Sequence, residues 1–388
     1  MAKLDVIIFG AGLSGATAAR LLAEQGHKVT IYEQRTHPGG NCYDYLNEHG
    51  IMIHKYGPHV FHTQNKQVYD FISKFTKFNT YKHQVLAVVE KQKIVLPLNL
   101  ASIAALAGKN ASLIIKQIIK LAKNKKFISI YDLINATHPG VQTFGQYVYD
   151  NIYVNYSTKM WGQSMDKIDH SVLDRIMIHL DKSNNFFPRD KYQGVPIGGY
   201  TQMIRNMLKH KNIKVNYGVN GPDILKIKNN RTYLNDTECK KTIFYCGSVD
   251  ELLENKYGYL LYRSLDIVLE THNVDAYQEV GVINYPADPS MTRITEYKKL
   301  SLQHDIRNVT TVSKEYPRAY NPDASTPSHR FYSVKSFETD LIFNKYLTEI
   351  KKIKNLHLLG RLAEYSYFDM DDAIANAMAK VAQILINY

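Results

Sequence analysis

Only three cysteines and one tryptophan occur in the 388 residues of this chain, and both scarcities limit its chemistry. Cys42, Cys239 and Cys246 are too few and too scattered for a disulfide framework or a metal site, so we expect no metal. No apolar run is long enough to span a membrane, and Met1 leads directly into a predicted strand without a secretory leader. The sequence therefore favours a cytoplasmic protein with no stable membrane insertion.

Charge of one sign is in excess, although the composition is otherwise that of a folded protein. Hydrophobic residues make up 45% of the chain and charged residues 22%, which excludes an extended disordered protein. The formal net charge of +12 points to an anionic partner such as a phosphate compound. No zinc-ligand spacing, RNA-binding aromatic signature or basic zipper occurs, so we expect no nucleic-acid binding. The 29 tyrosines suit a polar pocket or, more simply, a half-buried sheet.

The first 40 residues carry the clearest functional pattern. A β-branched run over residues 4–9 predicts a buried strand, residues 16–25 have helical spacing, and residues 28–32 predict a second strand. Before the helix, Gly10 permits a tight turn, Gly12 lets the backbone approach a pyrophosphate, and Gly15 allows close helix–strand packing. Glu33 follows the second strand, where an acid can reach a ribose hydroxyl. This order of elements indicates a dinucleotide-binding βαβ unit.

A second glycine turn, at residues 39–41, favours FAD over NAD as the dinucleotide. Flavoproteins approach their cofactor with such a turn, and a nicotinamide enzyme has no need of it. No second GxGxxG motif follows, so the sequence shows no dedicated site for NAD(P)H as a co-substrate. We predict FAD contacts from Gly10, Gly12, Leu13, Ser14, Gly15, Glu33, Gln34, Arg35, Gly40 and Asn41.

The rest of the chain predicts two further regions and a return to the first. Residues 100–180 are mostly helical, and residues 114–122 form either a packed helix with a basic outer face, which we favour, or a membrane-surface helix. Strand signals occur at 265–269, 281–284, 292–294 and 309–312. A strand at 356–360 and a helix from about 371 to 386 close the first lobe, and the N-terminus of that helix can face a flavin or its phosphates.

These elements predict an α/β fold: a Rossmann-like FAD-binding domain with a helical insert and an antiparallel β-sheet domain. We assign residues 1–80, 195–255 and 340–388 to the FAD-binding domain. The helical domain covers residues 100–180, with a mobile loop to about 190. The sheet domain takes residues 81–99 and 256–339.

Several segments together resemble one family, the UDP-galactopyranose mutases of the bacterial type, of which this chain looks like a divergent member. They occur in family order over nearly the whole chain, as YGPHVFHT (56–63), YSTKMWG (156–162), QGVPIGGYT (193–201), YRSL (262–265), TRITE (292–296), KEYP (314–317), GRL (360–362) and YFDMD (367–371).

The resemblance implies a flavin-dependent, non-redox isomerase. Such enzymes interconvert UDP-galactopyranose and UDP-galactofuranose, for cell-surface polysaccharide biosynthesis, through an adduct between flavin N5 and the sugar. The FAD must be reduced but undergoes no net redox change, which suits a flavin site without a nicotinamide site. The resemblance also implies a nucleotide-sugar substrate and a homodimer.

Site residues follow from the resemblance, position by position. Arg175, on the mobile loop, and Arg293 would grip the two phosphates, and these two residues together with His59 are the catalytic candidates. Tyr156 would stack on the uracil, and Trp161 would wall the sugar pocket. The remaining substrate candidates are Phe186, Arg263, Tyr316, Tyr367 and Asp369, and the further FAD candidates are His59, His62, Arg361, Met370 and Asp371.

Departures from the family pattern leave the substrate open. Phe186 stands where the family usually has Tyr, and Met160 replaces a Gln. The segments 296–299 and 331–333 also differ. UDP-N-acetylgalactosamine and dTDP-fucose are therefore alternative substrates. An FAD-dependent amine or alcohol oxidase and a non-catalytic basic protein that uses FAD structurally are alternatives of other classes.

Overall fold

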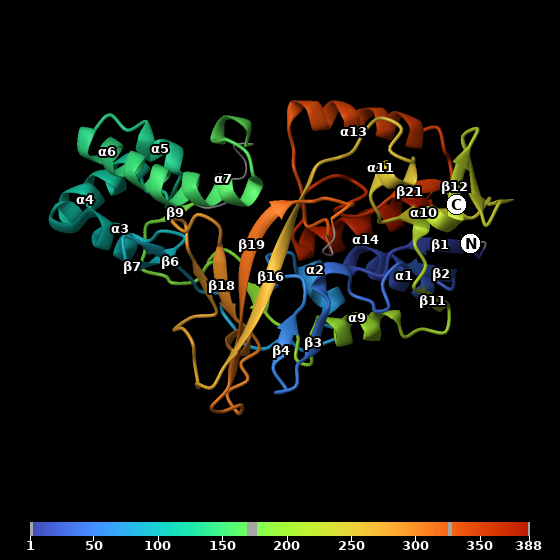
Figure 1. Cartoon of the computed structure of the whole chain (residues 1–388), viewed down its shortest axis with the longest axis horizontal. Coiled ribbons are helices and arrows are strands. Elements are labelled where there is room, and N and C mark those ends of the chain that lie inside the picture. Colours follow the sequence, from blue (N-terminus) through green and yellow to red (C-terminus); the bar gives the residue numbers. More distant parts are fainter. Residues whose placement is uncertain (1–2, 169–176, 325–327, 387–388) are drawn as a thin grey trace.

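The computed structural model describes residues 3–168, 177–324 and 328–386. The molecule is elongated, with helices α3–α6 at one end, a long twisted sheet in the middle, and a second lobe that holds both chain termini (Figure 1). Within these ranges no helix combines the length and apolar character needed to cross a bilayer.

The terminal lobe is built on a five-stranded parallel sheet of order β11-β2-β1-β15-β21. The predicted strands at its centre are confirmed, and every pairing in it is parallel. Its strands are β1 (Asp5–Phe9), β2 (Lys28–Glu33), β11 (Ile213–Tyr217), β15 (Thr242–Tyr245) and β21 (Leu356–Leu358). Residues from three distant parts of the chain therefore share one sheet.

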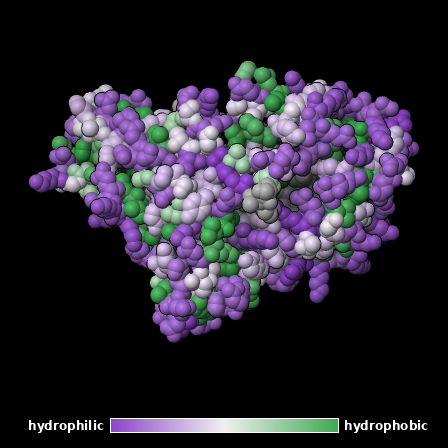
Figure 2. Space-filling model, in the orientation of Figure 1, coloured by the Kyte–Doolittle hydropathy of each residue, from purple (hydrophilic) through white to green (hydrophobic). Residues whose placement is uncertain are grey.

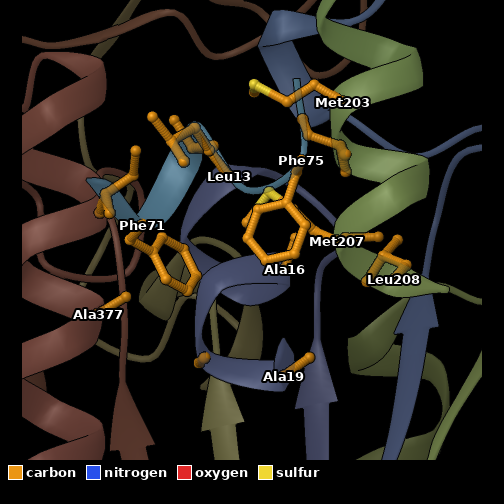
Figure 3. Close-up of a cluster of buried hydrophobic side chains, with 14 of the residues drawn as sticks. Leu13, Ala16, Ala19, Phe71, Phe75, Met203, Met207, Leu208 and Ala377 are labelled. Carbon is orange, nitrogen blue, oxygen red and sulfur yellow. The ribbon is translucent and has the colours of Figure 1, made fainter. Parts of the chain in front are cut away.

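Helices cover this sheet through small and apolar side chains. The predicted first helix, α1 (Leu13–Glu24), begins three residues earlier than expected, because Gly12 is its N-cap. Ala16, Ala18 and Ala19 are fully buried, which lets α1 lie close to its neighbours. Figure 3 shows α1 packing with side chains of α2 (Lys66–Ile72), α9 (Tyr200–Leu208) and the predicted C-terminal helix α14 (Met370–Ile386).

The central sheet has seven strands in the order β20-β16-β19-β18-β17-β6-β7. It is antiparallel, as predicted, except at β6–β17, which pair in parallel. The predicted strands at 265–269 and 309–312 are parts of two long strands that pair along their length. The seven are β6 (Val85–Val89), β7 (Gln92–Leu96), β16 (Tyr262–His272), β17 (Val282–Asn284), β18 (Arg293–Glu296), β19 (Thr310–Ala319) and β20 (Tyr332–Ser333).

The helical lobe holds α3 (Leu100–Ala107), α4 (Ala111–Ala122), α5 (Ile130–Ile134), α6 (Pro139–Val148), a π-helical segment (Tyr149–Val154) and α7 (Asn155–Trp161), with the short pair β8 (Phe127–Ile128) and β9 (Ile178–His179). Helix α4 packs into the lobe through Ile114, Ile118 and Ala122, and its lysines lie outside, in agreement with the interpretation we favoured. Most of the face in Figure 2 is hydrophilic, with apolar residues in scattered positions.

Smaller elements connect the regions. They are β3 (Asp44–Leu46) with β4 (Met52–His54), β5 (Phe61–Thr63) with β10 (Tyr192–Gly194), β12 (Leu225–Lys228) with β13 (Arg231–Leu234) and β14 (Thr237–Glu238), and the helices α10 (Gly221–Ile224), α11 (Val249–Leu252), α12 (Tyr297–Leu300) and α13 (Phe337–Ile350). The domain boundaries stay a prediction.

Candidate active site

Two cavities meet between the parallel sheet and the helical lobe. The glycine-loop cavity lies beyond the carboxyl ends of β1, β2, β15 and β21 and is walled by residues 10–15, 33–35 and 39–42. The Arg293 cavity lies between α7, the seven-stranded sheet and the loop before α14. His59, Arg361, Asp369 and Met370 line both cavities. A ligand that filled the first cavity could therefore present one end to a ligand in the second.

The glycine loop has the geometry that close backbone approach requires. Gly10 has φ +112°, a conformation that residues with a side chain rarely adopt. A Cβ on Gly15 would lie 2.0 Å from the carbonyl oxygen of Gly10, so only glycine fits. The loop leads into the N-terminus of α1, whose unpaired N–H groups suit an anion such as a pyrophosphate.

Glu33 is buried at the end of β2 and braces the same loop. Its Oε2 accepts a hydrogen bond from Ala11 N at 2.6 Å, and its Oε1 accepts one from Arg35 N at 2.9 Å. The carboxylate lines the glycine-loop cavity together with Gln34 and Arg35. The geometry thus places an acceptor at the position where the sequence predicts a contact to ribose.

The second glycine turn packs directly on the first. Gly39 N donates to Ala11 O at 2.9 Å, and a Cβ on Gly40 would lie 3.0 Å from Gly12 Cα. Arg35 extends along this turn and donates from Nη2 to Asn41 Oδ1 at 2.9 Å. Both glycine turns and Asn41 line one cavity, as expected of residues that share a ligand.

Arg361 lies at the junction of the two cavities. Its guanidinium donates to the carbonyl oxygen of Phe368 and lies 4.7 Å from the ring centre of Tyr367. The Tyr367 ring stacks in turn on Tyr332, with 6.0 Å between centroids. Asp369 and Met370 follow at the N-terminus of α14, so cationic, aromatic and backbone N–H groups gather here.

Arg293 supplies a second cation to its cavity. It lies on β18, and its Nε donates to Oε2 of the fully buried Glu315 on β19 at 2.8 Å. Burial acts to lower the pKa of this guanidinium, but the Glu315 carboxylate, together with Tyr156 and Tyr332, outweighs burial and raises that pKa above its usual value. Among the described residues, Glu315 is the hydrogen-bond partner of Nε and no partner of the two terminal nitrogens occurs, so those nitrogens can serve an anion in the cavity.

Tyr156 and two histidines complete the polar wall. Burial raises the pKa of the Tyr156 phenol, and burial lowers the pKa of both His59 and His83 to about 3, so all three are neutral near pH 7. His59 Nδ1 lies 2.8 Å from the carbonyl oxygen of Gly57, which can only accept. The proton of His59 is therefore on Nδ1, and Nε2 is an acceptor.

Most of the predicted site residues come together. Of the substrate candidates, Tyr156, Phe186, Arg293, Tyr367 and Asp369 line the Arg293 cavity. The FAD candidates that line the glycine-loop cavity are Gly10, Gly12, Leu13, Ser14, Gly15, Glu33, Gln34, Arg35, Gly40, Asn41, His59, Arg361 and Met370.

Some predicted residues lie elsewhere. Trp161 packs against Tyr332, 6.0 Å between ring centroids, and is not part of either cavity wall. Arg263 caps α7 by donating to the carbonyl oxygens of Met160 at 2.8 Å and Lys159 at 3.2 Å. Tyr316 packs in a small apolar cluster with Met291, Ile294 and Val312.

The remaining FAD or catalytic candidates are His62, Asp371 and Arg175. His62 lines the Arg293 cavity and not the glycine-loop cavity, since β5 pairs with β10 beside the former. Asp371 lies in the first turn of α14, between the lining residues Met370 and Ala373, but does not itself line the glycine-loop cavity. Arg175 lies outside the described residues.

The cavities also contain residues that the sequence did not single out. His83, Phe187, Asn284 and Tyr332 line the Arg293 cavity, and Arg330 lines the glycine-loop cavity. Asn284 stands opposite Arg293 in the pairing of β17 with β18, and its Oδ1 is buried without a hydrogen-bond partner in the described part of the chain. Only that register brings it to the cavity, so no local signal could have found it.

The fold and the glycine-loop cavity define a Rossmann-like dinucleotide-binding class. Residues 8–75 match the family model of NAD(P)-binding Rossmann-like domains. Among solved structures, a reduced UDP-galactopyranose mutase aligns with a TM-score of 0.73 at 15% identity, over 100% of this chain and 95% of that one. Putrescine oxidase bound to putrescine aligns at 0.59 and 11%, over 99% of both chains. At these identities the likeness shows the fold alone.

The sequence comparisons show the family. Residues 151–367 match the model of the UDP-galactopyranose mutases. A UDP-galactopyranose mutase of Mycoplasma pneumoniae is 36% identical, over 99% of this chain and 96% of that protein. A dTDP-fucopyranose mutase of Escherichia coli is 34% identical over 98% of both. The chain therefore belongs to the UDP-galactopyranose mutase family, an isomerase class, and the resemblance noted in the sequence is confirmed.

Proposed function

We propose that this enzyme binds FAD in the glycine-loop cavity and interconverts the pyranose and furanose forms of a nucleotide-linked sugar in the Arg293 cavity, with UDP-galactose as the first substrate to test. The observation that supports this most is the junction of the two cavities at His59, Arg361, Asp369 and Met370. A flavin anchored by its nucleotide end would reach the sugar there.

The residues present fit FAD. The Gly10–Gly15 turn has no room for side chains at its closest approach, the α1 N-terminus faces the same space, and Glu33 offers acceptor oxygens at the ribose position. When bound and reduced, FAD supplies the nucleophile for the anomeric carbon of the sugar. The protein contributes anchoring of the nucleotide end and, next to it, a cavity lined by Arg293 and Arg361.

The chain's own contribution in the Arg293 cavity is a grip on a diphosphate. Arg293 presents two terminal guanidinium nitrogens without a hydrogen-bond partner in the described part of the chain, and each charge-assisted contact to phosphate contributes roughly 1.5–3 kcal/mol. Arg175, by family position, adds the second grip. Fixed cations also stabilise the charge that develops on a departing nucleoside diphosphate. Tyr156 and Tyr367 on the same wall offer a ring face and a hydroxyl.

A separate question is which sugar and which nucleotide the substrate contains. Phe186 on the cavity wall lacks the hydroxyl that the family usually has there, and the Escherichia coli relative bears the name of a dTDP-fucopyranose mutase. UDP-N-acetylgalactosamine and dTDP-fucose are therefore tested beside UDP-galactose. The amine oxidases share the fold, but the cations Arg293 and Arg361 on the cavity wall disfavour an amine substrate.

The deciding experiment incubates the flavin-loaded protein with UDP-galactofuranose, with and without dithionite, and separates the products by chromatography. We expect UDP-galactopyranose only under reduction. Parallel arms use dTDP-fucofuranose and UDP-N-acetylgalactofuranosamine. Conversion of none of the three would overturn the proposal.

Two variants test the assigned roles. Arg293→Ala should abolish turnover and weaken UDP binding at least tenfold while flavin absorbance persists, because one charge-assisted phosphate contact is lost. Tyr156→Ala should weaken UDP binding with little change in the flavin spectrum. Calorimetry with UDP measures both, and an unchanged dissociation constant would remove the residue from the substrate site.

A further inference from the structure

A turn after the helical lobe holds one histidine of the Arg293 cavity from two sides. His62 lies in the middle of β5 and is paired with Gln193 of β10. Asp190 and Phe187 come from the residues that lead into β10. The carboxylate Oδ2 of Asp190 lies 2.6 Å from His62 Nδ1, and the Phe187 ring stacks on the imidazole with 3.5 Å between centroids and 13° between planes.

The turn itself is fixed by hydrogen bonds that do not involve the histidine. Gln193 Nε2 donates to the carbonyl oxygens of Phe187 at 2.6 Å and Asp190 at 3.0 Å. Asp190 N donates to Phe187 O at 3.1 Å. Since Gln193 is also the strand partner of His62, the carboxylate and the ring are held at a set distance from the imidazole.

This arrangement selects one tautomer of His62. Burial acts to raise the pKa of Asp190, but the hydrogen bond from His62, together with the nearby Gln64 and Arg189, outweighs burial, so that pKa lies below its usual value and the group is a carboxylate. A carboxylate only accepts, so the imidazole proton lies on Nδ1. In the neutral imidazole Nε2 then carries the lone pair, and within the described residues this nitrogen has no hydrogen-bond partner.

The chemistry of the cavity indicates which part of a ligand meets this nitrogen. Arg293 and Arg361 suit phosphate oxygens, whereas a lone-pair nitrogen repels them. A sugar hydroxyl can donate to that nitrogen. His62 is flanked by Phe187 and, beyond it, His83, whose ring lies 5.7 Å from Phe187. This side of the cavity therefore suits the sugar.

We propose that Asp190 is a positioning residue, which fixes His62 so that Nε2 accepts a hydrogen bond from a hydroxyl of the substrate sugar. The inference rests on the proposed function for the identity of the ligand. The arrangement of Asp190, His62 and Phe187 does not depend on it, because both contacts lie within the chain.

The test compares Asp190→Asn with the wild type, using protein labelled with ¹⁵N-histidine. We expect nitrogen chemical shifts of the Nδ1–H tautomer in the wild type and a shift toward the Nε2–H tautomer in Asp190→Asn, because an amide can also donate to Nδ1. Turnover should fall about tenfold or more, with the UDP dissociation constant unchanged within about twofold. Asp181→Asn is the matched control. Asp181 is an exposed residue of the same segment, and its carboxylate accepts a hydrogen bond from Ser183 N.

A second pair of variants checks the role at His62 itself. The amide of His62→Gln reaches the Nε2 position, whereas that of His62→Asn reaches only the Nδ1 position, so the Gln variant should retain about tenfold more turnover. Equal losses in these two variants, or an unchanged tautomer in Asp190→Asn, would overturn the inference even in an active enzyme. A wild type that converts no nucleotide sugar, with the tautomer shift present, would overturn the proposed function instead.

Discussion

Gly15 is the residue at which backbone geometry and ligand binding are most closely linked. Its missing side chain leaves room for the Gly10 carbonyl, which a Cβ would approach to 2.0 Å. The contact atom is backbone and cannot rotate away, so the α1 N-terminus would have to move. A shift at this point displaces the N–H groups that face the glycine-loop cavity.

We therefore expect Gly15→Ala to purify with little or no flavin, measured as the ratio of flavin to protein absorbance. Gly26→Ala is the control, because a Cβ on Gly26 would meet open space, although the φ of Gly26 is +87°. That variant should lose on the order of 1 kcal/mol of stability and keep its flavin. Equal flavin content in the two variants would contradict the assigned role of the glycine loop.

Residues such as Gly15 could be predicted from sequence because their constraints are local. Strand, glycine turn, helix and Glu33 follow each other within 33 residues, and each limits its neighbours. Asp190 and Asn284 could not be predicted, since strand register brings Asp190 to His62 and Asn284 to the cavity wall. Arg263 is a further case: its motif suggests a ligand contact, which stays a prediction, and the fold adds a structural contact that the motif did not indicate, since its guanidinium caps α7.

Helix α7 is the element that carries Tyr156 to the cavity, and one lysine ties it to the central sheet. Lys159 Nζ donates to carbonyl oxygens in the loop between β17 and β18, at 2.8 Å to Tyr285 and 2.7 Å to Met291, and also to Pro286 and Asp288. Among the described residues, these four carbonyl oxygens are the hydrogen-bond partners of the ammonium.

Lys159→Met should lower the free energy of unfolding by about 2–4 kcal/mol, because the loop carbonyls lose a shared donor. Since Tyr156 lies three residues before Lys159 on α7, UDP affinity should fall as well. Urea unfolding and calorimetry measure the two effects. Lys116→Met, at an exposed position of α4, should change neither the free energy of unfolding nor the UDP affinity. Equal behaviour of the two lysine variants would contradict the assigned role of Lys159.

At the scale of the whole molecule, the elements of both cavities are held by contacts between segments distant in sequence. His54 on β4 is an example: it is 1% exposed, and its Nδ1 accepts a hydrogen bond from His59 N at 3.0 Å. Protonation at Nδ1 would place two N–H groups face to face. The segment that carries His59 to the junction of the cavities therefore depends on a neutral His54.

This dependence predicts how stability varies with pH. Burial lowers the pKa of His54 from 6.5 to about 4, so below pH 6.5 the unfolded chain binds a proton that the folded protein does not. The neutral form of His54 therefore makes its full contribution to the free energy of unfolding above pH 6.5. This contribution is lost progressively as the pH falls toward 4. His59 and His83, both with pKa lowered to about 3 by burial, act in the same direction.

We expect urea midpoints to fall between pH 7.5 and pH 5, and His54→Asn, which keeps an acceptor near Nδ1 but does not titrate, to flatten that slope. An unaltered slope in this variant would show that the acid sensitivity lies elsewhere.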